Sequence, residues 1–154
     1  MSANNSARAR GDAGQVGGIE VLPFGLLTFV SAMLLFVNAW GVIDAKFAVT
    51  AAARESVRAF IEADTLPEAT TTAGRRATET IAAWGRDPQR ARVGSPEIGE
   101  PFGRCVRVAI TVSYEVPVIE VPFIGGFGSA THVGSTHSAL VDPFRSGIDG
   151  RTTC

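Results

Sequence analysis

The chain has 154 residues, of which 45% are hydrophobic, and its formal net charge at pH 7 is −1. A chain of this length has room for one small domain beside a separate apolar segment. The near-neutral charge gives no global basic field, which excludes nucleic-acid binding as the main function. The hydrophobic residues are concentrated in one long run near the N-terminus, so their position is more informative than their number.

This apolar run extends from Val21 to Ile43 and contains no charged residue. As a helix rising about 1.5 Å per residue it covers roughly 34 Å, which is enough to cross a hydrocarbon core of about 30 Å. The run therefore predicts one transmembrane helix over residues 21–43, preceded by a leader over residues 1–20. Membrane lipid is an expected partner.

Two alternatives remain open for the run. A buried core helix would need protein on every face, which so small a chain can hardly supply. A cleaved signal peptide is the stronger competitor, because Arg8 and Arg10 form a basic region and Ala39-Trp40-Gly41 loosely fits a small-x-small cleavage site. Against cleavage, the run is longer than the usual apolar core of about 7–15 residues, and Glu20 lies directly at its border.

The charges beside the predicted span do not decide its orientation, because arginines lie on both sides of it. Cys105 and Cys154 both follow the span, and in an oxidising compartment they could form a disulfide. Such a bond would favour an extracytoplasmic C-terminal domain. Two unrelated thiols are an equally good interpretation of the pair.

The helical pattern continues beyond the span over residues 44–63, which are rich in alanine and contain neither glycine nor proline. We expect one continuous helix whose outer half, residues 44–63, forms a stalk. The residues expected near one apolar face of the stalk are Phe47, Ala51, Val57 and Ile61. Residues 64–154 are then expected to form an extracytoplasmic α+β domain.

A second helix is predicted to follow. Thr65 is a suitable N-cap, Pro67 falls in the first turn and Glu68 lies three residues after the cap. The helix is expected to run to about Trp84 and to stop at Gly85. Apolar residues recur along it at steps of three and four, namely Leu66, Ala69, Ala73, Ala77, Ile81 and Trp84.

From Cys105 the apolar period changes from helical spacing to two, which is typical of a strand with one buried face. The residues on that face are Val106, Val108, Ile110, Val112, Tyr114 and Val116. A short strand is predicted over 91–93 and a later one over 129–141, while the Pro- and Gly-rich segment 117–128 should be a loop. The predicted fold class is α+β, with a small antiparallel sheet packed on helix.

The sequence offers little chemistry. His132 and His137 are five residues apart, which places them on opposite faces of a strand, and no Cys or His lies at the spacing of a zinc site. Gly125–Gly128 lacks the lysine and the spacing of a phosphate loop, and no G-x-S-x-G motif marks a nucleophile. We therefore expect no enzyme activity, no cofactor, no metal and no small-molecule substrate.

Glu20, at the head of the apolar run, has two interpretations. A carboxylate at a helix N-terminus complements the helix dipole by about 0.3–1 kcal/mol, and this could be its whole role. Alternatively, a charge half-buried among packed membrane helices needs a partner, and such residues are usually functional.

Three segments together resemble TadE-like pilus assembly proteins. They are the Arg-bearing, Gly-rich leader Arg10–Gly14, the stretch Val16–Pro23 at the head of the apolar run, and Ala51–Arg58 after it. The Val106–Pro117 strand and the segment Val141–Arg145 also resemble members from high-GC Gram-positive bacteria. The likeness is strong over residues 10–60 and loose after them.

The resemblance implies a pilin-like fold and the role of a minor pilin or pseudopilin of a tight-adherence (Flp-type) pilus or a related secretion system. It implies a protein of the cell membrane with a cytoplasmic N-terminus and an extracytoplasmic C-terminal domain. The implied partners are other pilin or Tad assembly subunits. Glu20 matches the glutamate that pairs with the N-terminal amine of a neighbouring subunit, and Pro23 belongs to the Leu-Pro at the start of the membrane helix. Cleavage between Gly14 and Gln15 would put Glu20 sixth in the mature chain, whereas family prepilins have their glutamate fifth.

A second hypothesis belongs to another functional class. In it the chain is a membrane-tethered extracytoplasmic binding module that is not incorporated in a pilus. The apolar loop residues Phe123, Ile124 and Phe127 would then contact a surface or envelope partner.

Overall fold

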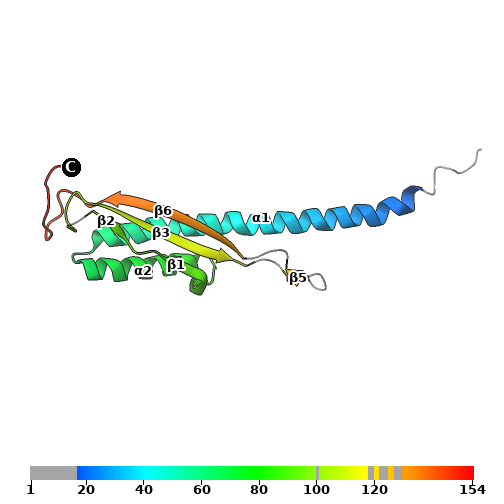
Figure 1. The fold of residues 1–154 in the computed structure, drawn as a ribbon, viewed down its shortest axis with the longest axis horizontal. Helices are drawn as coiled ribbons and strands as arrows, with labels where there is room; N and C mark the ends of the chain where they lie inside the picture. Colours follow the sequence, from blue (N-terminus) through cyan, green and yellow to red (C-terminus); the bar gives the residue numbers. More distant parts are fainter. Residues whose placement is uncertain (1–16, 100, 118–119, 122–124, 127–129) are drawn as a thin grey trace, which may run out of the picture. The chain divides into compact units, whose positions relative to one another are not determined.

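The computed structural model describes residues 17–99, 101–117, 120–121, 125–126 and 130–154 (Figure 1). The helices are α1 (Gly17–Glu62), α2 (Leu66–Ala83) and the 3-10 helix η1 (Pro88–Arg90). The strands are β1 (Ala91–Val93), β2 (Glu97–Ile98), β3 (Arg107–Val116), β4 (Glu120–Val121), β5 (Gly125–Gly126) and β6 (Thr131–Leu140). The chain divides into two compact units, with the boundary after Val37.

α1 is a single helix of 46 residues, which confirms the prediction of a continuous helix over the apolar run and the alanine-rich segment after it. No residue between the two segments breaks the helical pattern. Pro23 lies inside α1, near its N-terminus, where a proline removes one backbone hydrogen bond.

The two ends of α2 are fixed by local sequence. Thr65 is the N-cap, and its Oγ1 accepts a hydrogen bond from the Glu68 N–H at 3.4 Å. At the other end Gly85 has a φ of +70°, its N–H donates to Ala82 O, and the Arg86 N–H donates to Ile81 O. This pair of bonds is a Schellman motif, which needs a residue such as glycine in the left-handed region. The predicted start and stop of this helix are both confirmed.

The sheet of the second unit is antiparallel, with β3 at its centre. β6 pairs with β3 along its whole length, from Arg107 opposite Leu140 to Val116 opposite Thr131. β1 and β2 share the other edge of β3, and β4 and β5 form a separate two-stranded sheet. The long strand, the short strand over 91–93 and the later strand are as predicted, whereas β2 and the pairing of β4 with β5 inside the predicted loop were not foreseen.

The core lies between the sheet and the two helices, as Figure 1 shows for the second unit. Alternate residues of β3 are buried on the face toward the helices, and the α2 stripe contributes Ala69, Ala73, Ala77 and Ile81. The C-terminal half of α1 is buried along a face made by Ala45, Ala48, Val49, Ala52, Ala53, Ser56, Val57 and Phe60. The second unit begins at Asn38, so the predicted stalk is packed in the same unit as residues 64–154.

The apolar face predicted for residues 44–63 was partly wrong. Phe47 is 59% exposed, and Ala51 and Ile61 are only partly buried. Alanines occur on several sides of this helix, and the buried side is chosen by close approach to α2. One contact that fixes this approach is the hydrogen bond from Ser56 Oγ to Ala73 O at 3.1 Å. Small side chains at this point permit such an approach.

Candidate functional site

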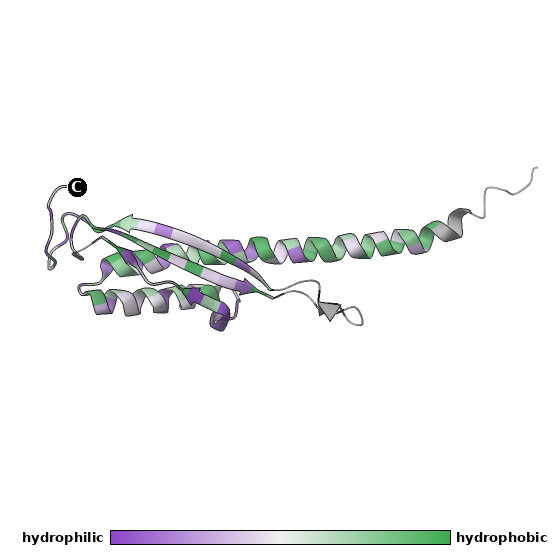
Figure 2. Ribbon diagram, viewed as in Figure 1, coloured by the Kyte–Doolittle hydropathy of each residue, from purple (hydrophilic) through white to green (hydrophobic). Residues whose placement is uncertain are grey.

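The N-terminal part of α1 presents apolar side chains on all sides. Within the described residues, α1 is the one helix long and apolar enough to cross a membrane, and its most apolar stretch has no buried residue. Figure 2 shows this stretch as largely green, the colour of hydrophobic residues. A large apolar side chain left in water forgoes roughly 1.5–3 kcal/mol relative to a buried one, so a row of them requires an apolar environment.

Some of the bulky residues of α1 form a regular row along one side, although others, such as Phe24, Leu27 and Leu35, lie on the remaining sides. The residues of the row recur at alternating steps of four and three, a period of 3.5 that keeps them along one side of a helix. In the first unit these exposed residues are Leu22, Leu26, Phe29, Met33 and Phe36, and the same spacing gives Trp40, Ile43 and Phe47 in the second. Phe47 lies two residues from both Ala45 and Val49, which are buried, and therefore on the opposite side of the helix from these two residues.

Of the site residues predicted from the sequence, Pro23 is exposed within α1. Glu20 belongs to the backbone of α1, but its side chain lies outside the described part of the structure. Gly14, Gln15 and the apolar loop residues of the binding-module hypothesis also lie outside the described residues.

Arg86 connects three elements at the end of the domain where α1 leaves its apolar run. Its Nη2 donates to Asp44 Oδ2 at 2.5 Å and to Gly41 O at 3.1 Å, both on α1. Its guanidinium carbon lies 5.4 Å from the centre of the Tyr114 ring on β3. The side chain is only 14% exposed, so these polar contacts are largely shielded from water.

The Schellman motif of α2 explains how Arg86 reaches α1. Gly85 turns the chain immediately after the last helical turn, and Arg86 is the next residue. The Nε of Arg86 is buried without a hydrogen-bond partner among the described residues. Arg86 is therefore held by the two hydrogen bonds of Nη2 and by the contact of its guanidinium with the Tyr114 ring.

Arg145 performs a similar role at the opposite end of the domain. Its guanidinium donates to the carbonyls of Ile61 and Glu62 and to Asp64 Oδ1, the last at 2.9 Å. α1 has no basic residue in its own last turn. A cation at a helix C-terminus satisfies free carbonyls and complements the helix dipole, and here it comes from a segment more than 80 residues away in sequence.

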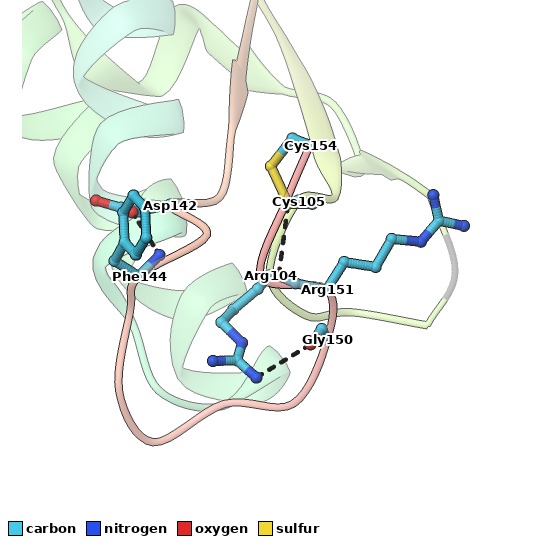
Figure 3. Close-up of a disulfide and its surroundings, with 7 residues drawn as sticks. All are labelled: Arg104, Cys105, Asp142, Phe144, Gly150, Arg151 and Cys154. Carbon is cyan, nitrogen blue, oxygen red and sulfur yellow. Dashed lines mark hydrogen bonds between the residues drawn. A yellow bond between two sulfur atoms is a disulfide. The ribbon is translucent and has the colours of Figure 1, made fainter.

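The C-terminal segment is also held by a disulfide. Cys105 and Cys154 are bonded, with their Cα atoms 5.4 Å apart and a sequence separation of 49 (Figure 3). Beside it, Arg104 N donates to Asp149 O at 2.8 Å, and Arg104 Nη2 donates to Gly150 O at 3.0 Å. A Cβ on Gly150 would lie 2.5 Å from Arg104 N, so this close approach requires glycine.

The described residues contain no group of three or more His, Cys, Asp or Glu side chains arranged to hold a metal ion. His132 and His137 lie on opposite faces of β6, with His137 on the side of the partly buried residues. The surface has several hollows. One is lined by Ile61, Leu140, Phe144 and Arg145, and another by the loop around the disulfide.

The sequence analysis did not foresee the sites at Arg86 and Arg145. Both arginines reach across 42 or more residues to their acidic partners, and no local pattern gives such a pairing. One usable signal was present, because Asp44 is the first charge after the apolar run and Arg86 directly follows the glycine that ends α2.

Comparisons with known proteins give no further identification. No family model, no curated protein and no solved structure matches the chain. The TadE-like resemblance therefore stays a prediction from the sequence.

Proposed function

We propose that this chain is a single-pass membrane protein that takes part in assembling a tight-adherence (Flp-type) pilus or a related secretion system, as a minor pilin or pseudopilin. Its N-terminus would be cytoplasmic and its α+β domain extracytoplasmic. The observation that carries the proposal is the exposed apolar part of α1, which continues without a break into the helix at the core of the domain. A structural subunit needs this combination of a membrane helix and a folded head.

One row of bulky residues along α1 supports assembly through helix packing. Side chains repeating every 3.5 residues form the seam along which helices pack together. In the second unit, Phe47 remains 59% exposed and lies beyond the end of the apolar run. The helix of a neighbouring pilin or Tad subunit would cover this phenylalanine.

Glu20 is the residue we propose to pair with a neighbouring subunit. It stands at the head of the apolar run, where a carboxylate left without a partner inside a helix bundle would be costly. A neighbour's N-terminal amine would supply the compensating charge. This pairing rests on the resemblance to TadE-like proteins together with the position of Glu20.

Deletion of the gene and complementation with two variants test the proposal in the native cell. The deletion should abolish pili or pilus-dependent secretion, and wild type should restore them. Glu20→Ala should reach the membrane fraction in normal amount and fail to restore assembly. Glu55→Ala is the matched control, because Glu55 is an exposed glutamate on the same helix but outside the apolar run, and it should complement fully. Normal pili and normal pilus-dependent secretion in the deletion strain would disprove the proposal.

A further inference from the structure

We propose that the segment Trp84–Arg90, here named the membrane-side turn, is a second contact of this protein with the lipid bilayer, with the Trp84 indole in the headgroup layer. The inference rests on the membrane-spanning role proposed for α1. It adds that the folded domain itself touches the membrane that α1 crosses.

The direction of the two helices brings this turn back to the start of the domain. α1 and α2 run antiparallel. Ser56 of α1 contacts Ala73 of α2, and the earlier residue Asp44 of α1 contacts the later residue Arg86, just after α2. α1 extends from its apolar run to Glu62, and α2 runs back in the opposite direction. The C-terminal end of α2 therefore lies near Asp44, the first residue after the apolar run. The segment that follows α2 is therefore placed beside the point where α1 would leave the bilayer.

The contacts of Arg86 fix the level of the turn along α1. Arg86 Nη2 lies 3.1 Å from Gly41 O and 2.5 Å from Asp44 Oδ2. Gly41 belongs to the apolar run, two residues before its end at Ile43, which at 1.5 Å per residue is about 3 Å on the apolar side of that border. The headgroup layer is roughly 5–8 Å thick on each side of the hydrocarbon core. Arg86 bonds one residue on each side of that border, so it lies where the hydrocarbon core meets the headgroup layer when α1 spans the bilayer.

The side chains of the turn suit that layer. Trp84 is 45% exposed although it is among the largest apolar residues of the domain, and tryptophan is enriched at membrane interfaces because its ring is amphipathic. Trp40, near the end of the apolar run on α1, is 61% exposed. The two tryptophans are the only ones in the chain, and both lie close to the same border.

The charges of the turn are compensated inside the protein. Arg86 pairs with Asp44, and Arg90 Nε lies 3.7 Å from Asp87 Oδ2. Paired charges reduce the cost of placing the turn beside the apolar part of the bilayer. The contact is thus assigned to the indole ring, and it does not depend on a net basic patch.

Tryptophan fluorescence of two single-tryptophan variants tests the inference. The full-length Trp40→Phe chain leaves only Trp84, and Trp84→Phe leaves only Trp40. Each is reconstituted into phosphatidylcholine–phosphatidylglycerol vesicles whose acyl chains carry bromine at defined depths, because bromine quenches nearby indoles. We expect both tryptophans to be quenched, and Trp84 to be quenched most by bromine nearest the headgroups and to be protected from acrylamide.

The outcomes separate this inference from the proposed membrane span. Quenching of Trp40 with no quenching of Trp84, whose emission stays red-shifted and open to acrylamide, overturns the lipid contact and leaves the span intact; Trp84 would then be available to a protein partner. Absence of quenching at both residues overturns the span as well.

Arg86→Met, introduced into the Trp40→Phe chain, gives a second readout. Because it removes the bonds that hold the turn beside Gly41, we expect bromine quenching of Trp84 to fall by at least half, while the same change in the Trp84→Phe chain leaves Trp40 unaffected.

Discussion

Arg86 shows how one side chain can hold together elements that are distant in sequence. Its guanidinium donates to α1 and lies over the aromatic ring of Tyr114 on β3, while its backbone completes the end of α2. A planar guanidinium can bond in its plane and stack on its face at the same time, which a lysine ammonium cannot do. The identity of the residue therefore matters at this position, and charge alone would not suffice.

We predict that Arg86→Met lowers the free energy of unfolding by about 2–4 kcal/mol, because hydrogen bonds to charged groups are worth about 1.5–3 kcal/mol each. The measurement is denaturant unfolding of the full chain in detergent micelles. A double-mutant cycle with Asp44→Ala should give a coupling of about 1–3 kcal/mol. Arg75→Ala is the control, because its exposed pair with Glu79 should contribute only about 0.3–0.5 kcal/mol. Equal losses for the two arginines would contradict this account of the site.

At the scale of elements, the C-terminus of α1 depends on a residue outside the helix. Its last turn contains no basic residue, and Arg145 supplies the donors to the carbonyls of Ile61 and Glu62. Arg145 also lines the surface hollow, together with Leu140 and Phe144. The end of the helix and the C-terminal segment therefore stabilise each other.

Arg145→Ala is predicted to lower the unfolding free energy by about 1–3 kcal/mol, through loss of charge-assisted hydrogen bonds to helix carbonyls. Because the defect should be local, amide hydrogen exchange should rise in the last turn of α1 and change little at the start of α2, which Thr65 caps independently. Arg145→Lys should lose less, and the exposed Arg92→Ala should match wild type. Unchanged exchange at residues 58–62 in Arg145→Ala would show that the cap does not hold the helix end.

The elements differ in how far they could be predicted from sequence. α2 was predictable at both ends because Thr65, Pro67, Glu68 and Gly85 act on the backbone next to them. β3 was predictable because a period of two separates its faces clearly. The buried face of α1 was not, since alanine fits on any side and tertiary packing made the choice. β2 has only two residues, too few for a periodic pattern.

At the scale of the whole chain, the disulfide closes a loop that contains β3, the segment after it, and β6. The two cysteines are the only ones in the chain. From their spacing alone the bonded pair and two free thiols were equally compatible with the sequence, because nothing local indicates that segment 103–105 meets residues 149–150. The close approach at Gly150 and the bonds of Arg104 bring the two segments together.

Removing this bond with the double variant Cys105→Ser, Cys154→Ser is predicted to lower the unfolding free energy by about 4 kcal/mol, the chain-entropy value for a loop of 49 residues. The same loss should follow when wild type is treated with a reductant, and the reductant should have no effect on the double variant. Denaturant unfolding measures the free energy of unfolding, and intact mass after alkylation shows whether the two cysteines are bonded. A wild-type chain that is alkylated at both cysteines without reduction would contradict the prediction.

The candidate site as a whole was predictable only in part. The apolar run and its position were visible in composition and length, and they needed no knowledge of tertiary contacts. The placement of Asp44 beside Arg86, and of Trp84 near the end of the run, follows from how α2 packs on α1. Such placement depends on contacts between residues far apart in sequence, which a single sequence does not display.

The dual use of α1 has a consequence for the biogenesis of this protein. Residues 45–60 supply a large part of the buried core, and they follow directly on the segment proposed to stay in the bilayer. With the proposed orientation, the domain could not complete its core on the cytoplasmic side and then cross the membrane, because the second half of α1 would have to emerge on the outer side first. α2 and the sheet would then assemble on it as they follow, so secretion and folding of this chain would be a single ordered process.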